Sequence, residues 1–311
     1  MPPITLPSRL LALPAALRSL AFKSSIQPVQ SISRSYATYN TNASGTPQPQ
    51  SSVNDTEVTH FNALASTWWD PHGSSRLLHL MNPLRHDFIG KCLGPNASIH
   101  KSGKGLRVLD IGCGGGIFAE SAARRQDVES VTAIDPSPEV IAIAKQHRRH
   151  DPHLMQPGKL NYRNVAIEGL KSSDHEGFDI ISVFEVIEHI QSPSAFLEQV
   201  LPHLKPGGWL VGSTIARTGT SWFTTKFMAE DVLRIVPRGT HEWSQYINPG
   251  EMREWARSRK ELDVDVGGDG WRQMGVVYVP GLGWREVNSS ESWGNYFFGA
   301  RKRIVAESGK E

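Results

Sequence analysis

A glycine-rich segment between a short apolar strand and a helix limits the possible folds of this chain more than any other feature. The segment DIGCGGG (110–116) overlaps the end of an apolar run at 107–111, and a helical pattern follows it at 117–125. Glycines at such a strand-to-helix turn let backbone N–H groups approach a ligand at the N-terminus of the helix. The segment therefore predicts a ligand-binding α/β fold of the nucleotide-binding kind.

The residues around this segment alternate between strand and helix patterns. Strands are predicted at 107–111, 130–134, 160–165, 178–184, 209–215, 273–279 and 295–300, and helices at 83–93, 117–125, 136–149 and 192–204. Strands separated by single helices form right-handed βαβ units, which give a mostly parallel sheet with helices on both faces. Apolar residues at helical spacing in 61–69 add a helix before this unit. The expected fold is a seven-stranded α/β sandwich with extra N-terminal helices.

The spacing of the glycines indicates which ligand is bound. Single residues separate Gly112, Gly114 and Gly116, whereas the NAD-binding pattern is G-x-G-x-x-G. Asp110 precedes the first glycine by two residues, and Asp135 follows it by 23 residues at the end of the second predicted strand. An acidic residue there accepts hydrogen bonds from the hydroxyls of an adenosine ribose. This set resembles the first motif of class I S-adenosylmethionine-dependent methyltransferases. The alternatives are a dehydrogenase and a purely structural glycine turn.

An acidic cluster follows the fourth predicted strand, whose carboxyl end should face the ligand. One helical turn would place Glu185, Glu188 and His189 on the same face. Two carboxylates and an imidazole could hold Mg²⁺, whose remaining positions the two oxygens of a catechol could fill. Alternatively, Glu188 or His189 acts as general base without a metal. In a third interpretation the acidic residues only stabilise the start of a helix.

The first 54 residues differ in composition from the rest of the chain. They contain four basic residues and no Asp or Glu, and 1–36 are rich in serine. This composition is typical of a mitochondrial transit peptide. Residues 37–54 are rich in Ser, Thr, Asn, Gln and Pro, which predicts a disordered linker. The folded domain is expected to comprise 55–311.

The overall composition excludes several other classes of protein. The chain has 33 Lys and Arg against 31 Asp and Glu, and the small excess comes from the first 54 residues, so nucleic-acid binding is not expected. Its two cysteines, Cys92 and Cys113, could form one disulfide at most. Its longest apolar runs are shorter than the roughly 18–20 residues that a membrane-spanning helix requires.

Seven stretches between about Phe61 and Lys302 form a more specific pattern than the glycine segment alone. They are FNALASTWWDP (61–71), MNPLRHDFI (81–89), VLDIGCGGGIFAES (108–121), FEVIEHI (184–190), LKPGG (204–208), a stretch at 213–241 containing VPRGTH, and NYFFGARK (295–302). Together they resemble the ubiquinone-biosynthesis O-methyltransferases, and three of them are not general methyltransferase motifs. The resemblance implies a class I methyltransferase fold. It also implies methyl transfer from S-adenosylmethionine to a catechol oxygen of polyprenyl-dihydroxybenzoate and demethylubiquinol.

The resemblance also implies roles for individual residues. Arg85 would reach the cofactor's carboxylate, which suits the planar fork of a guanidinium. Phe184 would pack near the adenosine, and Glu185, Glu188 and His189 would be Mg²⁺ ligands. The expected cofactor-binding residues are Arg85, Asp110, Gly112, Gly114, Asp135 and Phe184.

The segment 222–238 carries apolar residues at helical spacing beside basic residues. Such a helix can lie in a membrane interface, although packing against a core is the more common meaning. A polyprenyl tail stays in the bilayer, so we expect peripheral attachment to the matrix face of the mitochondrial inner membrane. The family resemblance adds other proteins of a ubiquinone-synthesis complex as partners. Two alternatives remain, namely a non-catalytic methyltransferase-like subunit of that complex and a methyltransferase for another catechol.

Overall fold

The computed structural model describes residues 52–53, 58–59, 61–62, 65–73, 75–94, 105–218, 246–265 and 269–304. All of them belong to the second of two units, Ser51–Glu311. The predicted transit peptide (1–36), nearly all of the predicted linker (37–54) and the segment 222–238 lie outside the described residues.

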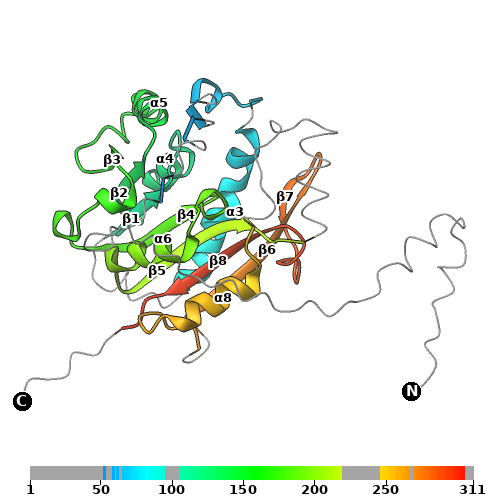
Figure 1. Ribbon diagram of the computed structural model, residues 1–311. Coiled ribbons are helices and arrows are strands. Elements are labelled where there is room, and N and C mark those ends of the chain that lie inside the picture. Colours follow the sequence, from blue (N-terminus) through cyan, green and yellow to red (C-terminus); the bar gives the residue numbers. More distant parts are fainter. Residues whose placement is uncertain are drawn as a thin grey trace, which may run out of the picture. The chain divides into compact units, whose positions relative to one another are not determined.

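The centre of this unit is one eight-stranded sheet (Figure 1). Its strands are β1 (Leu106–Ile111), β2 (Val128–Asp135), β3 (Leu160–Asn164), β4 (Phe178–Phe184), β5 (Leu204–Ile215), β6 (Trp271–Val279), β7 (Gly283–Glu286) and β8 (Asn295–Arg301). The order is β3-β2-β1-β4-β5-β8-β6-β7, and the first five run parallel. β8 lies antiparallel between β5 and β6. The α/β prediction is confirmed, and all seven predicted strands are present.

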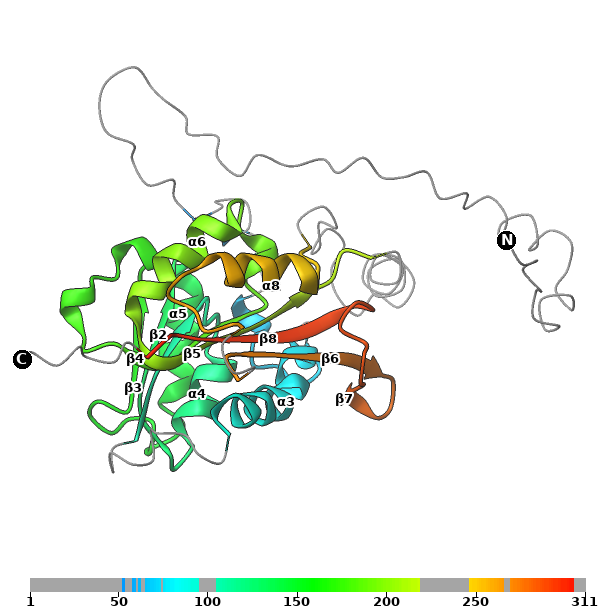
Figure 2. The same cartoon turned by 90° about the horizontal axis from the view of Figure 1, so that it is seen from below.

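Helices cover both faces of the sheet. They are α3 (Arg76–Leu93), α4 (Ile117–Ala123), α5 (Pro138–Arg148), α6 (Pro193–Val200) and α8 (Pro249–Ser258). Single 3-10 turns are η2 (Ala65–Thr67), η4 (Ile167–Gly169), η5 (Ser172–Asp174), η6 (Ile187–His189) and η7 (Leu201–His203). Figure 2 shows α3 and α4 on one side of the sheet and α6 and α8 on the other. The sheet is therefore buried on both faces, as its apolar strands predict.

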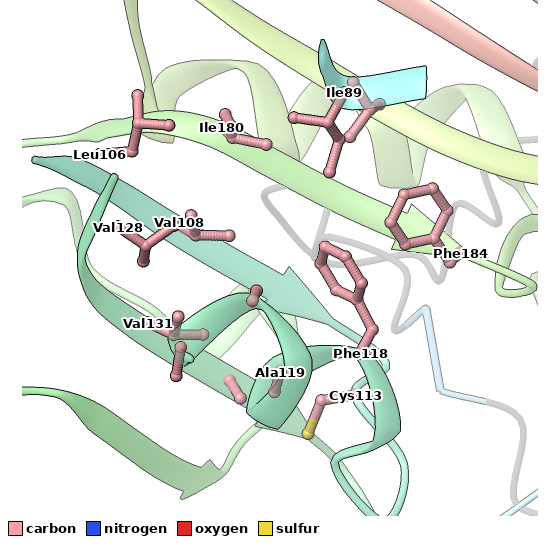
Figure 3. Close-up of a cluster of buried hydrophobic side chains, with 14 of the residues drawn as sticks. Ile89, Leu106, Val108, Cys113, Phe118, Ala119, Val128, Val131, Ile180 and Phe184 are labelled. Carbon is pink, nitrogen blue, oxygen red and sulfur yellow. The ribbon is translucent and has the colours of Figure 1, made fainter. Parts of the chain in front are cut away.

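Alternating side chains along each strand supply two separate cores. Val108 belongs to the core under α3 and α4, whereas Leu109 belongs to the core under α6 and α8. Figure 3 shows Phe118 of α4 and Phe184 of β4 pointing toward one another in the first core. Their rings meet edge to face, with centroids 4.8 Å apart. This contact packs the first helix after the glycine segment against the end of β4.

Two predicted boundaries are wrong, and one strand was not predicted. The helix predicted to begin at Pro83 begins at Arg76, and Pro83 lies inside α3. A proline there loses one backbone hydrogen bond, but the burial of Met81 and Phe88 on the same helix compensates for that loss. The strand predicted to begin at Trp209 begins at Leu204, so the LKPGG stretch is the first part of β5. β7 was not predicted because its four residues begin with a glycine and show no strand pattern.

The topology brings the carboxyl ends of β1, β2, β4 and β5 to one edge of the sheet. In open α/β sheets, ligands bind outside this edge. Both cysteines are buried and free. Among the described residues, no helix is long and apolar enough to cross a membrane.

Candidate functional site

The glycine segment forms a tight loop between β1 and α4. Gly112, Gly114 and Gly116 all have positive φ angles, of 67°, 53° and 91°. Other residue types rarely adopt this conformation, so the loop depends on these glycines. The backbone N–H groups of Gly112 and Cys113 both donate to the carbonyl of Ile134, at 2.9 and 3.1 Å. These bonds fix the loop against the end of β2.

Asp135, the last residue of β2, is tied to the same loop. Its Oδ2 accepts the Gly114 N–H at 3.0 Å, and its Oδ1 accepts the Ser137 N–H at 2.9 Å. Burial raises the pKa of this carboxyl, and the two backbone donors oppose the rise. Each oxygen keeps a second acceptor position. Asp135 is therefore suited to receive the ribose hydroxyls of an adenosine, as the sequence predicts.

Arg85 and Asp110 are two buried charges that do not pair with each other. Arg85 of α3 and Asp110 of β1 are each 3% exposed. Each lies within electrostatic range of the other, but Arg85 forms no ion pair with a described carboxylate. Arg85 Nε and Asp110 Oδ2 are buried without a hydrogen-bond partner. Buried polar atoms are rarely left this way, so a ligand with groups of both charges would satisfy them.

Phe184 lies beside these charges at the end of β4. The guanidinium of Arg85 is 5.1 Å from the centre of the Phe184 ring, within the range of a cation–π contact. The ring also packs on Phe118 and Phe297. Phe184 therefore helps to hold Arg85 in place at the glycine loop, and contact with an adenosine stays a prediction.

Glu185, Glu188 and His189 do not share one helical turn, so that expectation is wrong. The turn η6 contains only Ile187–His189, and Glu185 lies before it with a positive φ of 56°. The Ser213 hydroxyl donates to Glu185 Oε1 at 2.6 Å, and the Thr214 hydroxyl donates to Glu188 Oε2 at 2.9 Å. Consecutive strand residues point to opposite faces of a sheet. The two carboxylates are therefore held on opposite faces of β5.

The separation of the Glu185 and Glu188 carboxylates argues against the expected Mg²⁺ site. Carboxylate oxygens are the ligands that Mg²⁺ prefers, but a chelating pair must converge on one point. Within the described part of the chain, no three His, Cys, Asp or Glu side chains gather as a metal-binding group. As placed, Glu185, Glu188 and His189 do not fit a formed magnesium site.

Glu188 has the properties of a buried general base or acid. It is 5% exposed, and burial raises its pKa to about 7, with Glu185 adding to the rise and His189 opposing it. A carboxyl with a pKa near neutral can both accept and release a proton at physiological pH. His189 follows it directly, and its ring meets the edge of Phe61 at a centroid distance of 5.1 Å.

The N-terminal segment contributes residues to which the sequence assigned no role. The ring of Trp68 covers the glycine loop so closely that a Cβ on Gly114 would lie 2.3 Å from it. The Trp69 indole donates to the carbonyl of Gly115 at 2.9 Å and stacks on His147. Phe61 contacts both Trp68 and His189. This segment therefore joins the glycine loop to the acidic segment.

Three hydroxyl residues at the site were also missed from the sequence. They are Ser182 of β4 and the pair Ser213 and Thr214 of β5, and all are fully buried. A signal was present for Ser182, because a hydroxyl between two apolar residues of a buried strand needs a hydrogen-bond partner. Nothing in the sequence indicates that its partner is Asp110.

The sequence is similar to known methyltransferases. A family model described as a methyltransferase domain matches residues 75–260. The mitochondrial ubiquinone biosynthesis O-methyltransferase of Candida albicans is 39% identical over 289 residues, covering 81% of this chain and 86% of that protein. The corresponding protein of Saccharomyces cerevisiae is 36% identical, covering 80% and 88%. The ubiquinone biosynthesis O-methyltransferase of Alkalilimnicola ehrlichii is 38% identical, covering 73% and 84%.

Solved structures support the fold independently. The plantazolicin methyltransferase BamL, in complex with a triazolic desmethylPZN analog and SAH, is 14% identical and has a TM-score of 0.52, covering 80% of this chain and 98% of that one. At this identity the similarity concerns the fold alone. The relatives above exceed one third identity over most of the chain and carry the family name. This chain therefore belongs to the ubiquinone biosynthesis O-methyltransferases.

Proposed function

We propose that this chain transfers a methyl group from S-adenosylmethionine to a catechol hydroxyl of polyprenyl-dihydroxybenzoate and of demethylubiquinol. The relatives' names support an O-methyltransferase of ubiquinone biosynthesis. The observation that carries the proposal is the position of two groups of residues. The glycine loop with Arg85, Asp110 and Asp135 lies at the same edge of the sheet as Glu188 and His189.

The ribose, the carboxylate and the ammonium of the cofactor each have a matching group in the chain. Asp135 is suited to the ribose, and the backbone of Gly112 and Gly114 allows close approach of the ligand. The unpartnered atoms of Arg85 and Asp110 have the charges that the cofactor's carboxylate and ammonium require. These residues fit S-adenosylmethionine, which supplies an electrophilic methyl group on its sulfonium sulfur when bound.

The acceptor reaction needs a base. The catechol hydroxyl must lose its proton as its oxygen forms a bond to the methyl carbon and the carbon–sulfur bond breaks. Glu188 is the better candidate, because its raised pKa near 7 matches proton transfer at neutral pH. His189, next to it, is the second candidate. The products are the methyl ether and S-adenosylhomocysteine, and the proton goes to the base.

Mg²⁺ remains a prediction from the family resemblance. Glu185 and Glu188 would each have to leave the hydroxyl of Ser213 or Thr214 to meet at one ion. The proton transfer from the hydroxyl to Glu188 or His189 does not depend on such a rearrangement.

The proposed location rests on the proposed substrate and on the names of the relatives. We propose a transit peptide at 1–36, a linker at 37–54 and the catalytic domain at 55–311. Several relatives are named mitochondrial, which supports import into that organelle. We place the enzyme peripherally at the matrix face of the inner membrane, together with other proteins of ubiquinone synthesis. Trp293 is an exposed apolar side chain (53%), and the next residue, Gly294, accepts the Ala216 N–H just after β5, which is compatible with a lipid surface at this edge.

A methyl-transfer assay tests the proposal. Labelled S-adenosylmethionine and a short-tailed dihydroxybenzoate are incubated with the protein, with and without EDTA. We expect label in the methyl ether of the ring. Loss of transfer with EDTA, reversed by Mg²⁺, would establish the metal requirement. Binding of S-adenosylhomocysteine without transfer to any catechol would instead indicate the non-catalytic subunit, and transfer only to soluble catechols would indicate another substrate.

A further inference from the structure

We infer that Ser182 and Asn82 are positioning residues that hold the buried charges of Asp110 and Arg85 apart, which keeps the site open for the zwitterionic tail of the cofactor. The inference rests on the proposed function, because it concerns how the chain recognises S-adenosylmethionine. Neither residue belongs to the glycine loop or to the acidic segment.

Ser182 fixes one oxygen of Asp110. The two residues are direct neighbours across β4 and β1, and Ser182 is completely buried. Its hydroxyl donates to Asp110 Oδ1 at 2.7 Å and lies 3.3 Å from the carbonyl of Leu109. The second oxygen, Oδ2, is buried and without a partner. The hydroxyl therefore determines how the carboxyl plane is rotated and which oxygen stays available.

Asn82 fixes the guanidinium of Arg85 in the same way. Its Oδ1 accepts from Arg85 Nη1 at 3.0 Å, and its Nδ2 donates to the carbonyl of Ile117 at 2.9 Å. Ile117 is the first residue of α4, directly after the glycine loop. Asn82 thus connects Arg85 to this helix, while the Nε of Arg85 stays buried and unpartnered.

The two tethers counteract a strong attraction. Opposite charges in a buried site attract each other strongly and normally form a direct ion pair. Arg85 and Asp110 form none, although each affects the charge state of the other. A ligand with an ammonium next to a carboxylate can satisfy both groups at once. The amino-acid tail of the cofactor has this form, whereas 5′-methylthioadenosine has the same nucleoside and thioether but no tail.

Without a tether, the two charges should approach and pair directly. This pairing would close the tail site but would replace two unsatisfied buried groups by an ion pair. Loss of the Ser182 hydroxyl should therefore weaken binding of the tail without lowering the stability of the ligand-free protein. An ordinary buried serine has the opposite effect, because its removal costs stability and leaves ligand binding unchanged.

The test compares two ligands and two serines by calorimetry and thermal unfolding of the full chain. In Ser182→Ala the dissociation constant of S-adenosylhomocysteine should rise about tenfold, since a hydrogen bond to a charged group is lost from the tail site. That of 5′-methylthioadenosine should change less than about twofold. The melting temperature of the ligand-free protein should not fall. Asn82→Ala should show the same selectivity, and Ser182→Cys, a weaker donor of similar shape, should lie between wild type and Ser182→Ala.

Ser290→Ala is the matched control. Ser290 is equally buried and donates to the carbonyl of Val287 at 2.8 Å, in the segment between β7 and β8. Ser290→Ala should lower the melting temperature and leave the affinities for S-adenosylhomocysteine and 5′-methylthioadenosine unchanged. Equal loss of both ligands in Ser182→Ala, a melting temperature lowered as in Ser290→Ala, or unchanged S-adenosylhomocysteine binding would each overturn the inference. A wild-type protein that binds neither ligand would refute the proposed function itself, and this inference with it.

Discussion

At the scale of single residues, the site is defined by buried charges. Arg85, Asp110 and Glu188 are buried and Asp135 is partly buried at the edge of the sheet where the strands have their carboxyl ends. Burial disfavours their charged forms, so each needs a nearby donor, acceptor or opposite charge. Asp135 and Glu188 have such partners in the chain, whereas Arg85 and Asp110 keep unsatisfied atoms.

Asp135→Ala should weaken all adenosine-containing ligands alike. The affinities for S-adenosylhomocysteine and 5′-methylthioadenosine should both fall about tenfold or more, because both share the ribose that this carboxylate would bind. Titration calorimetry measures both. Asp265→Ala, at an exposed carboxylate paired with Arg257, is the control and should bind like wild type. Weaker binding of only one of the two ligands would show that Asp135 does not contact the ribose.

The pKa of Asp110 predicts how stability depends on pH. Burial raises it from an ordinary value of 3.8 to about 7, with Ser182 and Arg85 opposing the rise. Between these two values the folded chain holds a proton that the unfolded chain has released. The free energy of unfolding should therefore fall as pH rises through this window. In Asp110→Asn the free energy of unfolding should fall less over the same window. Urea unfolding from pH 4.5 to 7.5 measures it. Parallel curves for the two proteins would contradict the raised pKa.

Residue types could be predicted from the sequence, but their partners could not. Asp135 is recognisable by its distance from Gly112, because the βαβ unit fixes the length between them. Ser182 holds Asp110 from a strand 72 positions further along the chain. This contact depends on the register between β1 and β4, which the sequence pattern does not determine.

At the scale of elements, the glycine loop is built jointly with the N-terminal segment. Trp68 lies on Gly114 and Gly115, and Trp69 donates to the carbonyl of Gly115. The glycines are therefore required for this packing as well as for approach of a ligand. The sequence predicted extra N-terminal helices but not two indoles in direct contact with the loop.

Gly114→Ala should destabilise the protein more than Gly158→Ala. Both glycines have positive φ, so both substitutions strain the backbone, by about 1–3 kcal/mol. At Gly158 the new Cβ meets no atom, whereas at Gly114 it lies 2.3 Å from the Trp68 ring. Thermal unfolding of both variants gives the difference in their stability, which measures the cost of the new contact with Trp68. Equal destabilisation would show that Trp68 moves away without cost.

Strands were easier to predict than the turns at their ends. Apolar β-branched runs such as 178–184 have only one favourable arrangement in a doubly covered sheet. The acidic segment after β4 was expected to be helical because of its residue spacing. Its backbone instead has a positive φ at Glu185, and Ser213 bonds to this residue through both its hydroxyl and its carbonyl. A tertiary contact of this kind overrides local spacing.

At the scale of the whole molecule, the proposed function requires a soluble cofactor and a lipid-tailed acceptor to meet at one edge of the sheet. The predicted interfacial segment 222–238 lies outside the described residues, so its role remains a prediction. Phe227→Asp combined with Leu233→Asp should reduce co-flotation with anionic liposomes and leave turnover of a short-tailed substrate unchanged. Met155→Asp, at a side chain that is 45% exposed just beyond α5, is the control. Unchanged flotation of the double variant would remove this segment from the membrane contact.

The most direct test of the account is methyl transfer by Glu188→Gln, measured together with its binding of S-adenosylhomocysteine. Arg85 and Asp110, the proposed cofactor residues, contact Phe184 and Ser182, whereas Glu188 bonds to Thr214 of β5. We expect the wild type to transfer labelled methyl to the dihydroxybenzoate. The variant should bind S-adenosylhomocysteine as tightly as wild type and transfer methyl about 10²–10⁴-fold more slowly. Absence of methyl transfer to the catechol by the wild type, or loss of S-adenosylhomocysteine binding in the variant, would contradict the proposed mechanism.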